Sequence, residues 1–215
     1  MSTPADPVND RAGADPAPDT EPTASRIGLL PRDLALIALF AALIAVLGLP
    51  GSFALFGSAV PITAQSLGVM LAGSILGAKR GMLAVLTLLV LVAAGLPLLP
   101  GGRGGIGVFV GPTGGYLIGW LLGAFVIGVL VTKVTGRTRL PGLILANVLG
   151  GIVAIYAIGI PVTAWRVDSG LLATIVSSLQ FLPGDAIKVV LSALITAAVH
   201  RAYPIPAAGR RSGER

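Results

Sequence analysis

Residues 81–99 read Gly81-Met82-Leu83-Ala84-Val85-Leu86-Thr87-Leu88-Leu89-Val90-Leu91-Val92-Ala93-Ala94-Gly95-Leu96-Pro97-Leu98-Leu99, a run without one charged side chain. An α-helix needs about 20 apolar residues to cross the hydrocarbon core of a bilayer. The whole chain has this character, because 54% of its 215 residues are hydrophobic and 11% are charged. Soluble domains carry about 25% charged residues. The sequence therefore predicts an integral membrane protein.

Five further apolar stretches match this one in length, so we expect the chain to cross the membrane six times. The expected spans are residues 33–50, 59–78, 81–99, 114–132, 140–163 and 184–202. Backbone groups find no water in the bilayer core, so each span should be a helix. Lengths near 20 and the lack of alternating apolar and polar segments exclude a membrane β-barrel. The predicted fold class is an all-α integral membrane protein.

Basic residues predict the orientation, because Lys and Arg concentrate in cytoplasmic connections. They occur before the first span, between the second and third, between the fourth and fifth, and after the sixth: Arg26, Arg32, Lys79, Arg80, Lys133, Arg137, Arg139, Arg201, Arg210, Arg211 and Arg215. The remaining connections contain only Arg103 and Arg166. This alternation predicts a multi-pass plasma-membrane protein with both termini in the cytoplasm.

The two ends of the chain differ from the six-helix membrane domain expected over residues 26–203. Residues 1–25 are rich in Pro, Ala, Asp and Thr, and five acids against one Arg give them a net charge of −4. Such a segment cannot bury a core and should be disordered, and it lacks the apolar region of a signal peptide. Residues 204–215 form a basic tail, expected in the cytoplasm. Because the whole chain is +6, the remainder is +10, which suits anionic lipid rather than nucleic acid.

Small residues recur four apart in several of the spans. The two glycine series are Gly73-x-x-x-Gly77-x-x-x-Gly81 and Gly115-x-x-x-Gly119-x-x-x-Gly123. This spacing lets helices approach closely, and packing within the bundle is the favoured interpretation. The first span has a similar face with Ala38, Ala42 and Ala45, which could either meet a partner helix or pack within the bundle.

Two connections on the outer side are apolar and rich in Gly and Pro, namely residues 50–58 and residues 97–116. A simple connector would be shorter and more polar. Irregular apolar backbone near a membrane is tolerated where it is buried in protein or lines a cavity. We therefore expect both loops to fold over the outer mouth of the bundle as a lid or a pocket wall. The alternative is that they only seal the bundle against water.

Asp185 and Lys188 stand at the head of the last span, in Leu182-Pro183-Gly184-Asp185-Ala186-Ile187-Lys188. Pro183 suits the first turn of a helix, the positive helix end favours Asp185, and Lys188 lies on the same face. The pair should lie at the outer surface or just below it. A helix cap with its own Lys is one interpretation, but ionisable groups in a membrane are costly and mark functional sites.

The charges expected on the outer side are three cations and two acids, which gives a net charge of +1: Arg103, Arg166, Lys188, Asp168 and Asp185. Thr63 and Gln65, one turn into the second span, add neutral polar groups. Ligand pockets are mostly apolar with a few placed polar groups. These residues therefore suit a small ligand with an anionic end, a hydrogen-bonding end and an apolar body.

Several kinds of chemistry are excluded by missing residues. The chain has no Cys and one His (His200), so neither a thiolate site nor a metal cluster is expected. It lacks the phosphate loop of ATPases and the Gly-x-Ser-x-Gly turn of hydrolases. We expect neither a cofactor nor catalysis.

Four strings together resemble the BioY family, the biotin-binding S components of energy-coupling factor (ECF) transporters, over roughly residues 33–203. They are Val60-Pro61-Ile62-Thr63-Ala64-Gln65, residues 72–81, Gly111-Pro112-Thr113-Gly114-Gly115-Tyr116 and Pro183-Gly184-Asp185-x-x-Lys188. The resemblance implies the six-helix S-component fold and capture of biotin from outside. It implies that Asp185 and Lys188 line the biotin site, and we add Thr63, Gln65, Arg103 and Tyr116 as candidate contacts.

The resemblance also implies partners, namely a transmembrane coupling protein and ATPase subunits, the former meeting Ala38, Ala42 and Ala45. Lys188 or Arg103 could pair with the biotin carboxylate, and Asp185 and Gln65 could meet its ureido ring. Three alternatives remain open at this point: an S component for another vitamin, a small channel, and a membrane-embedded enzyme.

Overall fold

The computed structural model describes residues 29–49, 63–134 and 139–202. In these ranges the regular secondary structure is helical, apart from an isolated bridge between Leu99 and Arg103. The all-α fold class is thereby confirmed. The predictions for the tails (residues 1–25 and 204–215) and for the loop at residues 50–58 lie outside the described residues.

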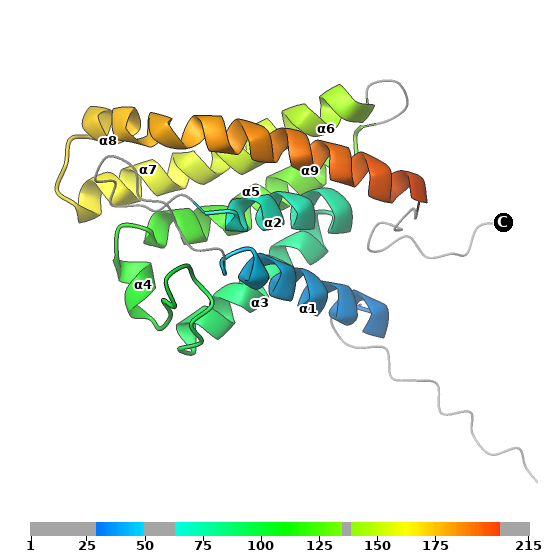
Figure 1. Cartoon of the computed structure of the whole chain (residues 1–215), viewed down its shortest axis with the longest axis horizontal. Helices are drawn as coiled ribbons and strands as arrows, with labels where there is room; N and C mark the ends of the chain where they lie inside the picture. Colours follow the sequence, from blue (N-terminus) through cyan, green and yellow to red (C-terminus); the bar gives the residue numbers. More distant parts are fainter. Residues whose placement is uncertain (1–28, 50–62, 135–138, 203–215) are drawn as a thin grey trace, which may run out of the picture.

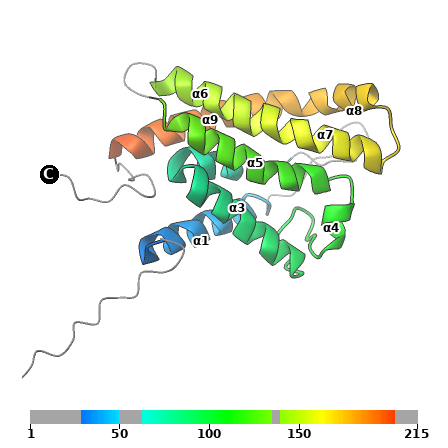
Figure 2. The same cartoon turned by 180° about the vertical axis from the view of Figure 1, so that it is seen from behind.

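The described helices pack as an elongated bundle (Figure 1). The first three helical segments are α1 (Pro31–Val46), α2 (Gln65–Leu71) continued by the π-helix η1 (Ala72–Leu76), and α3 (Ala78–Ala93). The short α4 (Gly107–Val110) and the long α5 (Gly114–Val131) follow. Two composite helices complete the bundle: α6 (Arg139–Val148), the π-helix η3 (Leu149–Ala154) and α7 (Ile155–Arg166), and then α8 (Leu171–Ser178), the 3₁₀-helix η4 (Leu179–Phe181) and α9 (Leu182–Ala202). In both views α6 to α9 form one side, α1 and α3 form the other, and α2 and α5 lie between them (Figure 2).

Within the described residues, six apolar helical rods occupy the positions of the six predicted spans. Three of them are long and apolar enough to cross a membrane: Gly114–Val131, Arg139–Arg166 and Leu171–Ala202. The other three are shorter, since α1 and α3 have 16 residues each and Gln65–Leu76 falls below the length of a full span. The count of six crossings therefore stays a prediction.

Two expected boundaries are wrong. The last rod begins at Leu171 rather than at residue 184, because residues 171–182 contain no helix-breaking residue and continue as helix through η4 into α9. The connection between the second and third rods is Gly77 alone, with φ of 82°. Lys79 and Arg80 therefore lie in the first turn of α3 rather than in a loop.

The glycine series pack helices of this chain against one another, as expected. A Cβ built on Gly119 would lie 2.8 Å from the carbonyl oxygen of Ile155. A Cβ on Gly123 would lie 2.7 Å from the carbonyl oxygen of Gly150. Glycine therefore lets α5 approach the backbone of η3 and α7 closely.

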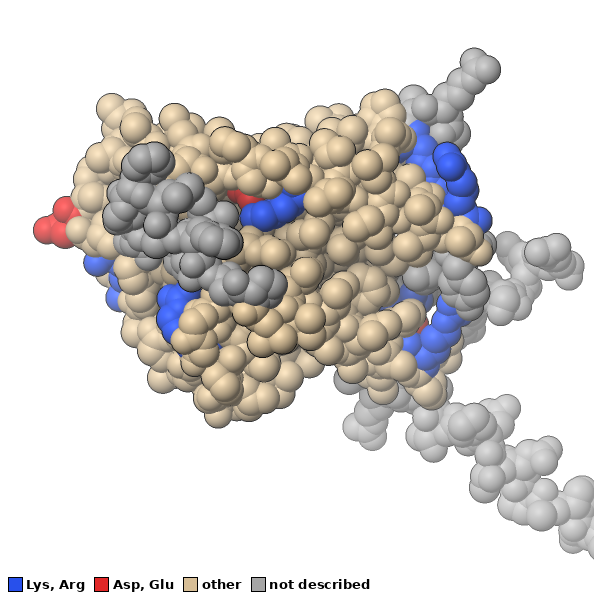
Figure 3. Space-filling model, viewed as in Figure 1, with Lys and Arg blue, Asp and Glu red and all other residues tan. Residues whose placement is uncertain are grey.

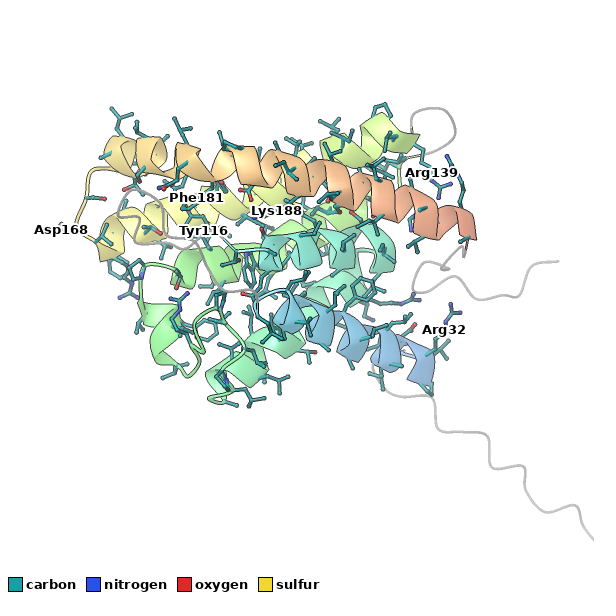
Figure 4. The ribbon with its side chains drawn as sticks, in the orientation of Figure 1. Arg32, Tyr116, Arg139, Asp168, Phe181 and Lys188 are labelled. Atoms are coloured by element: carbon teal, nitrogen blue, oxygen red, sulfur yellow. The ribbon has the colours of Figure 1, made fainter. Side chains whose placement is uncertain are left out.

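Basic residues gather at one end of the bundle, which we call the basic end. They stand at the starts of α1, α3 and α6 and at the ends of α5 and α9: Arg32, Lys79, Arg80, Lys133, Arg139 and Arg201. Figure 3 shows Lys and Arg side chains grouped there, and Figure 4 labels Arg32 and Arg139 at this end and Asp168 at the other. The opposite end, where residues 94–113 connect α3 to α5, is called the loop end.

Candidate ligand-binding site

Asp185 and Lys188 form an ion pair on α9, with 3.0 Å between Lys188 Nζ and Asp185 Oδ1. The exposed fractions of the two side chains are only 9% and 13%. Lys188 Nζ also donates a hydrogen bond to Ser66 Oγ at 2.9 Å. Because Ser66 stands in the first turn of α2, the pair joins α9 to α2.

Tyr156 of α7 completes the environment of this carboxylate, because its Oη donates to Asp185 Oδ2 at 2.6 Å. Both carboxylate oxygens therefore have side-chain partners, one on α9 and one on α7. The helix-cap interpretation accounts for the Lys188 contact but not for a hydroxyl supplied by a different rod. In a low-dielectric interior such a buried pair is stable only when it is fully hydrogen-bonded.

The pair lies further along its rod than the sequence suggested. Lys188 is 17 residues after Leu171 and 14 residues before Ala202, because α8 adds two turns before α9. Its depth below the outer membrane surface stays a prediction. Relative to α2 and α5 the pair is still near the loop end, beside the first turns of both helices.

An aromatic-walled cavity of about 70 Å³ adjoins the ion pair. Its lining residues come from α2, α5, η3, α7, η4 and α9 and from Thr63, two residues before α2: Thr63, Ser66, Tyr116, Trp120, Gly151, Ile155, Tyr156, Phe181, Asp185 and Lys188. Tyr116 meets Tyr156 and Phe181 edge-on, with ring centroids 5.9 and 6.4 Å apart. Figure 4 shows Tyr116, Phe181 and Lys188 converging between α5 and α9. The cavity can hold an apolar body beside a polar wall.

A second cavity of about 50 Å³ adjoins the first, and Thr63, Tyr116 and Trp120 line both. Its other lining residues are Gln65, Leu99, Pro100, Arg103, Thr113 and Leu117. Arg103 comes from a tight turn closed by the Leu99 bridge, and its Nε donates to the Pro100 carbonyl at 3.2 Å. The two cavities therefore form one elongated site with the ion pair at one end and a guanidinium at the other.

Gln65 is fully buried at the Arg103 end. Its Nε2 donates to the carbonyls of Ile44 and Leu98, at 3.2 and 3.0 Å. Its Oε1 has no hydrogen-bond partner among the described residues. A buried acceptor without a partner costs about 1–3 kcal/mol.

The structure brings all six predicted site residues around these cavities: Thr63, Gln65, Arg103, Tyr116, Asp185 and Lys188. Arg166 is elsewhere, at the exposed end of α7, with its guanidinium carbon 4.4 Å from the ring centroid of Trp165. On α1, Ala38 and Ala42 are exposed and Ala45 is half-buried. These alanines do not line either cavity.

Sequence reasoning missed six residues that line the first cavity: Ser66, Trp120, Gly151, Ile155, Tyr156 and Phe181. Three of them had usable signals in the sequence. Ser66 follows Gln65 directly, and Trp120 is one helical turn beyond Tyr116. Tyr156 has a hydroxyl within a span that is otherwise almost wholly apolar, which makes it a candidate site residue. Phe181 offers no local signal, because a single Phe in a largely apolar stretch is an ordinary residue there.

Removing the Tyr156 hydroxyl should weaken ligand binding. In Tyr156→Phe, Asp185 loses a hydrogen bond to a charged acceptor, which is worth about 1.5–3 kcal/mol. We expect at least a tenfold rise in the Kd for the ligand, measured by equilibrium binding to the purified protein. Tyr116→Phe is the matched control, because its hydroxyl meets only the neutral Ser178 Oγ, at 3.2 Å. Equal effects of the two substitutions would show that the carboxylate contact has no special role.

A buried ion pair beside aromatic cavities, inside a bundle of apolar helices, defines a membrane-embedded small-molecule-binding protein. The model of the BioY family matches residues 19–205, so the chain belongs to the BioY family. The resemblance seen in the sequence is thereby confirmed.

Named relatives and a solved structure agree with this membership. The biotin transporter BioY of Rhizobium etli is 50% identical over 179 residues, covering 81% of this chain and 96% of that protein. That of Rhodobacter capsulatus is 46% identical over 192 residues, covering 80% and 95%. A crystal structure of the S component for biotin from an ECF-type ABC transporter matches with a TM-score of 0.75 at 35% identity, covering 79% of this chain and 91% of that one. The chain is a multi-pass protein of the plasma membrane.

Proposed function

We propose that this chain is the substrate-binding membrane subunit of an ECF-type transporter and that it captures biotin from outside the cell. The observation that supports this most directly is the elongated site, polar at both ends and aromatic between them. Biotin has the same order of groups: a ureido ring, an apolar fused ring and chain, and a carboxylate. The relatives named as biotin transporters support the same ligand and favour transport over catalysis.

The charges suggest which end of biotin meets which residue. Lys188 is neutralised by Asp185 at 3.0 Å, so this end suits the neutral ureido group, which can both donate and accept hydrogen bonds. Arg103 has no carboxylate partner in the part of the chain that the structure describes. We therefore assign the biotin carboxylate to Arg103. The sequence left open whether Lys188 or Arg103 meets the carboxylate, and this assignment selects Arg103.

The membrane arrangement completes the proposal. With the basic end in the cytoplasm, the site opens towards the loop end and the outside, and all six rods cross the bilayer. No phosphate loop occurs in the sequence, so energy must come from ATPase subunits through a transmembrane coupling protein. The exposed small residues Ala38 and Ala42 of α1, with Ala45 beside them, give that protein a surface that permits close approach.

A ligand comparison tests the proposal and the assignment of ends together. Wild-type protein should bind biotin more tightly than biotinamide, which lacks the charged carboxylate. Arg103→Gln should weaken biotin binding about tenfold or more, as expected for loss of a charged hydrogen bond, and leave biotinamide nearly unchanged. Equilibrium binding with labelled biotin and competing biotinamide measures both.

Each alternative predicts a different pattern in this comparison. If Lys188→Met, rather than Arg103→Gln, removed the preference for biotin over biotinamide, the assigned ends would be reversed. Absence of biotin binding to the wild-type protein would disprove the proposed function. Tighter competition by lipoate, thiamin or riboflavin would indicate an S component for another vitamin, and product formation would indicate an enzyme.

A further inference from the structure

A groove of about 420 Å³ runs along the surface of the loop end, beside α4. Four of its eight lining residues are glycines: Gly102, Arg103, Gly104, Gly107, Val108, Gly111, Pro112 and Thr113. It is larger than either inner cavity, and most of its lining residues line neither of them.

Arg103 and Thr113 line both this groove and the second cavity. Thr63, Tyr116 and Trp120 in turn line both inner cavities. The three spaces therefore follow one another from the surface to the ion pair, with the Arg103 side chain between the first and the second. We propose that this groove is the entrance through which a small carboxylate-bearing ligand reaches the site, passing Arg103 on its way. The inference rests on the proposed function and adds a route to it.

The walls of the groove suit the passage of a ligand rather than its tight binding. The glycines contribute no side chains to its walls, so a ligand meets little that could hold it there. Arg103 is half-buried, and its charge has no carboxylate partner among the described residues. A positive charge at the head of a low-dielectric passage draws an anion inwards.

Moving Arg103 aside costs little. In the described structure its side chain donates from Nε to the Pro100 carbonyl, which belongs to the same turn. The side chain can therefore swing between the groove and the inner cavity without unfolding the turn, and it can accompany the carboxylate inwards.

The chain has no native Cys, so single cysteines placed in the groove can be blocked selectively. Gly107→Cys and Gly111→Cys are suitable, because a Cβ at Gly107 has no neighbour within 4 Å and one at Gly111 makes only ordinary contacts, at 3.8 and 3.9 Å. Gly170→Cys is the control, since a Cβ there is also unobstructed and the residue lies outside the groove.

Each purified variant is labelled with a bulky maleimide, and association and dissociation rates of biotin are measured before and after labelling. At Gly107 and Gly111 the label should slow both rates at least tenfold while Kd changes less than threefold, because a blocked passage hinders entering and leaving equally. At Gly170 it should change neither rate.

Unchanged association and dissociation rates in both labelled groove variants would show that the groove is not the entrance. So would a weaker Kd with an unchanged association rate, because the label would then disturb the site and not the route. These failures differ from failure of the proposed function, in which the unlabelled proteins would not bind biotin at all. The fraction of binding-competent protein and the melting temperature confirm that each variant is folded, and the second groove position replaces the first if one variant is not.

Discussion

Replacing Lys188 with methionine should weaken biotin binding roughly 30-fold or more, which is the largest effect on binding that the site predicts. The substitution removes the donor to both Asp185 and Ser66, and truncating one member of a buried charge pair costs about 2–5 kcal/mol of binding. It also leaves the Asp185 carboxylate buried with Tyr156 as its remaining partner. Stability should therefore fall as well, by roughly 3 kcal/mol.

A double substitution separates these two effects. Asp185→Asn combined with Lys188→Met removes both charges while nearly preserving both shapes, so thermal stability in detergent should return close to that of the wild type. Biotin binding should remain weakened, because the ammonium donor and the carboxylate acceptor proposed for the ureido group are both gone. Lys133→Met, an exposed position at the basic end, should change neither quantity. Recovery of binding in the double variant would show that the pair serves the fold rather than the ligand.

Gly119→Ala should lower both stability and affinity although it touches no ligand. The new Cβ would lie 2.8 Å from the carbonyl oxygen of Ile155 and 3.1 Å from its Cα, so the backbone of α7 must move. Overpacking of this kind costs about 1–3 kcal/mol. Ile155 precedes Tyr156, so the same displacement should stretch the 2.6 Å hydrogen bond to Asp185 and weaken biotin binding several-fold.

Thermal denaturation and equilibrium biotin binding of the purified variant check this prediction. Gly170→Ala is the matched control, because its backbone has φ of −61° and a Cβ there meets nothing within 4 Å. Because Gly170 is the N-cap of α8, where alanine is less favourable than glycine, this change should cost at most about 1 kcal/mol of stability and leave the Kd unchanged. If Gly119→Ala kept both the melting temperature and the Kd of the wild type, the close approach of α5 to α7 would be unimportant.

Local patterns in the sequence were enough to predict the helical rods, the glycine contacts and the pairing of Asp185 with Lys188. Each depends on residues within one or two helical turns. The partners of the pair could not be predicted in this way, since Tyr156 is 29 residues from Asp185 and Ser66 is 122 residues from Lys188. Contacts between residues so far apart in the sequence depend on how the rods pack against one another. A single sequence does not specify that packing.

A buried polar network illustrates the same limit. Asn147 of α6 is fully buried, exchanges hydrogen bonds with Ser74 of η1 and accepts one from Ser192 of α9 at 3.0 Å. Each residue alone is an ordinary polar residue in an apolar span. Only the assembled bundle shows that the three satisfy one another, which membrane interiors require of polar groups.

The rods of this bundle differ greatly in length. The rod from Leu171 to Ala202 has 32 residues, roughly 48 Å at 1.5 Å per residue, and α3 has 16, roughly 24 Å. A hydrocarbon core about 30 Å thick matches neither. Where α3 crosses the bilayer as proposed, the lipid beside it must thin, while the opposite wall must lean or protrude, each at a modest elastic cost. The free energy of this hydrophobic mismatch depends on bilayer thickness. The tilt of the subunit should therefore differ between thin and thick membranes.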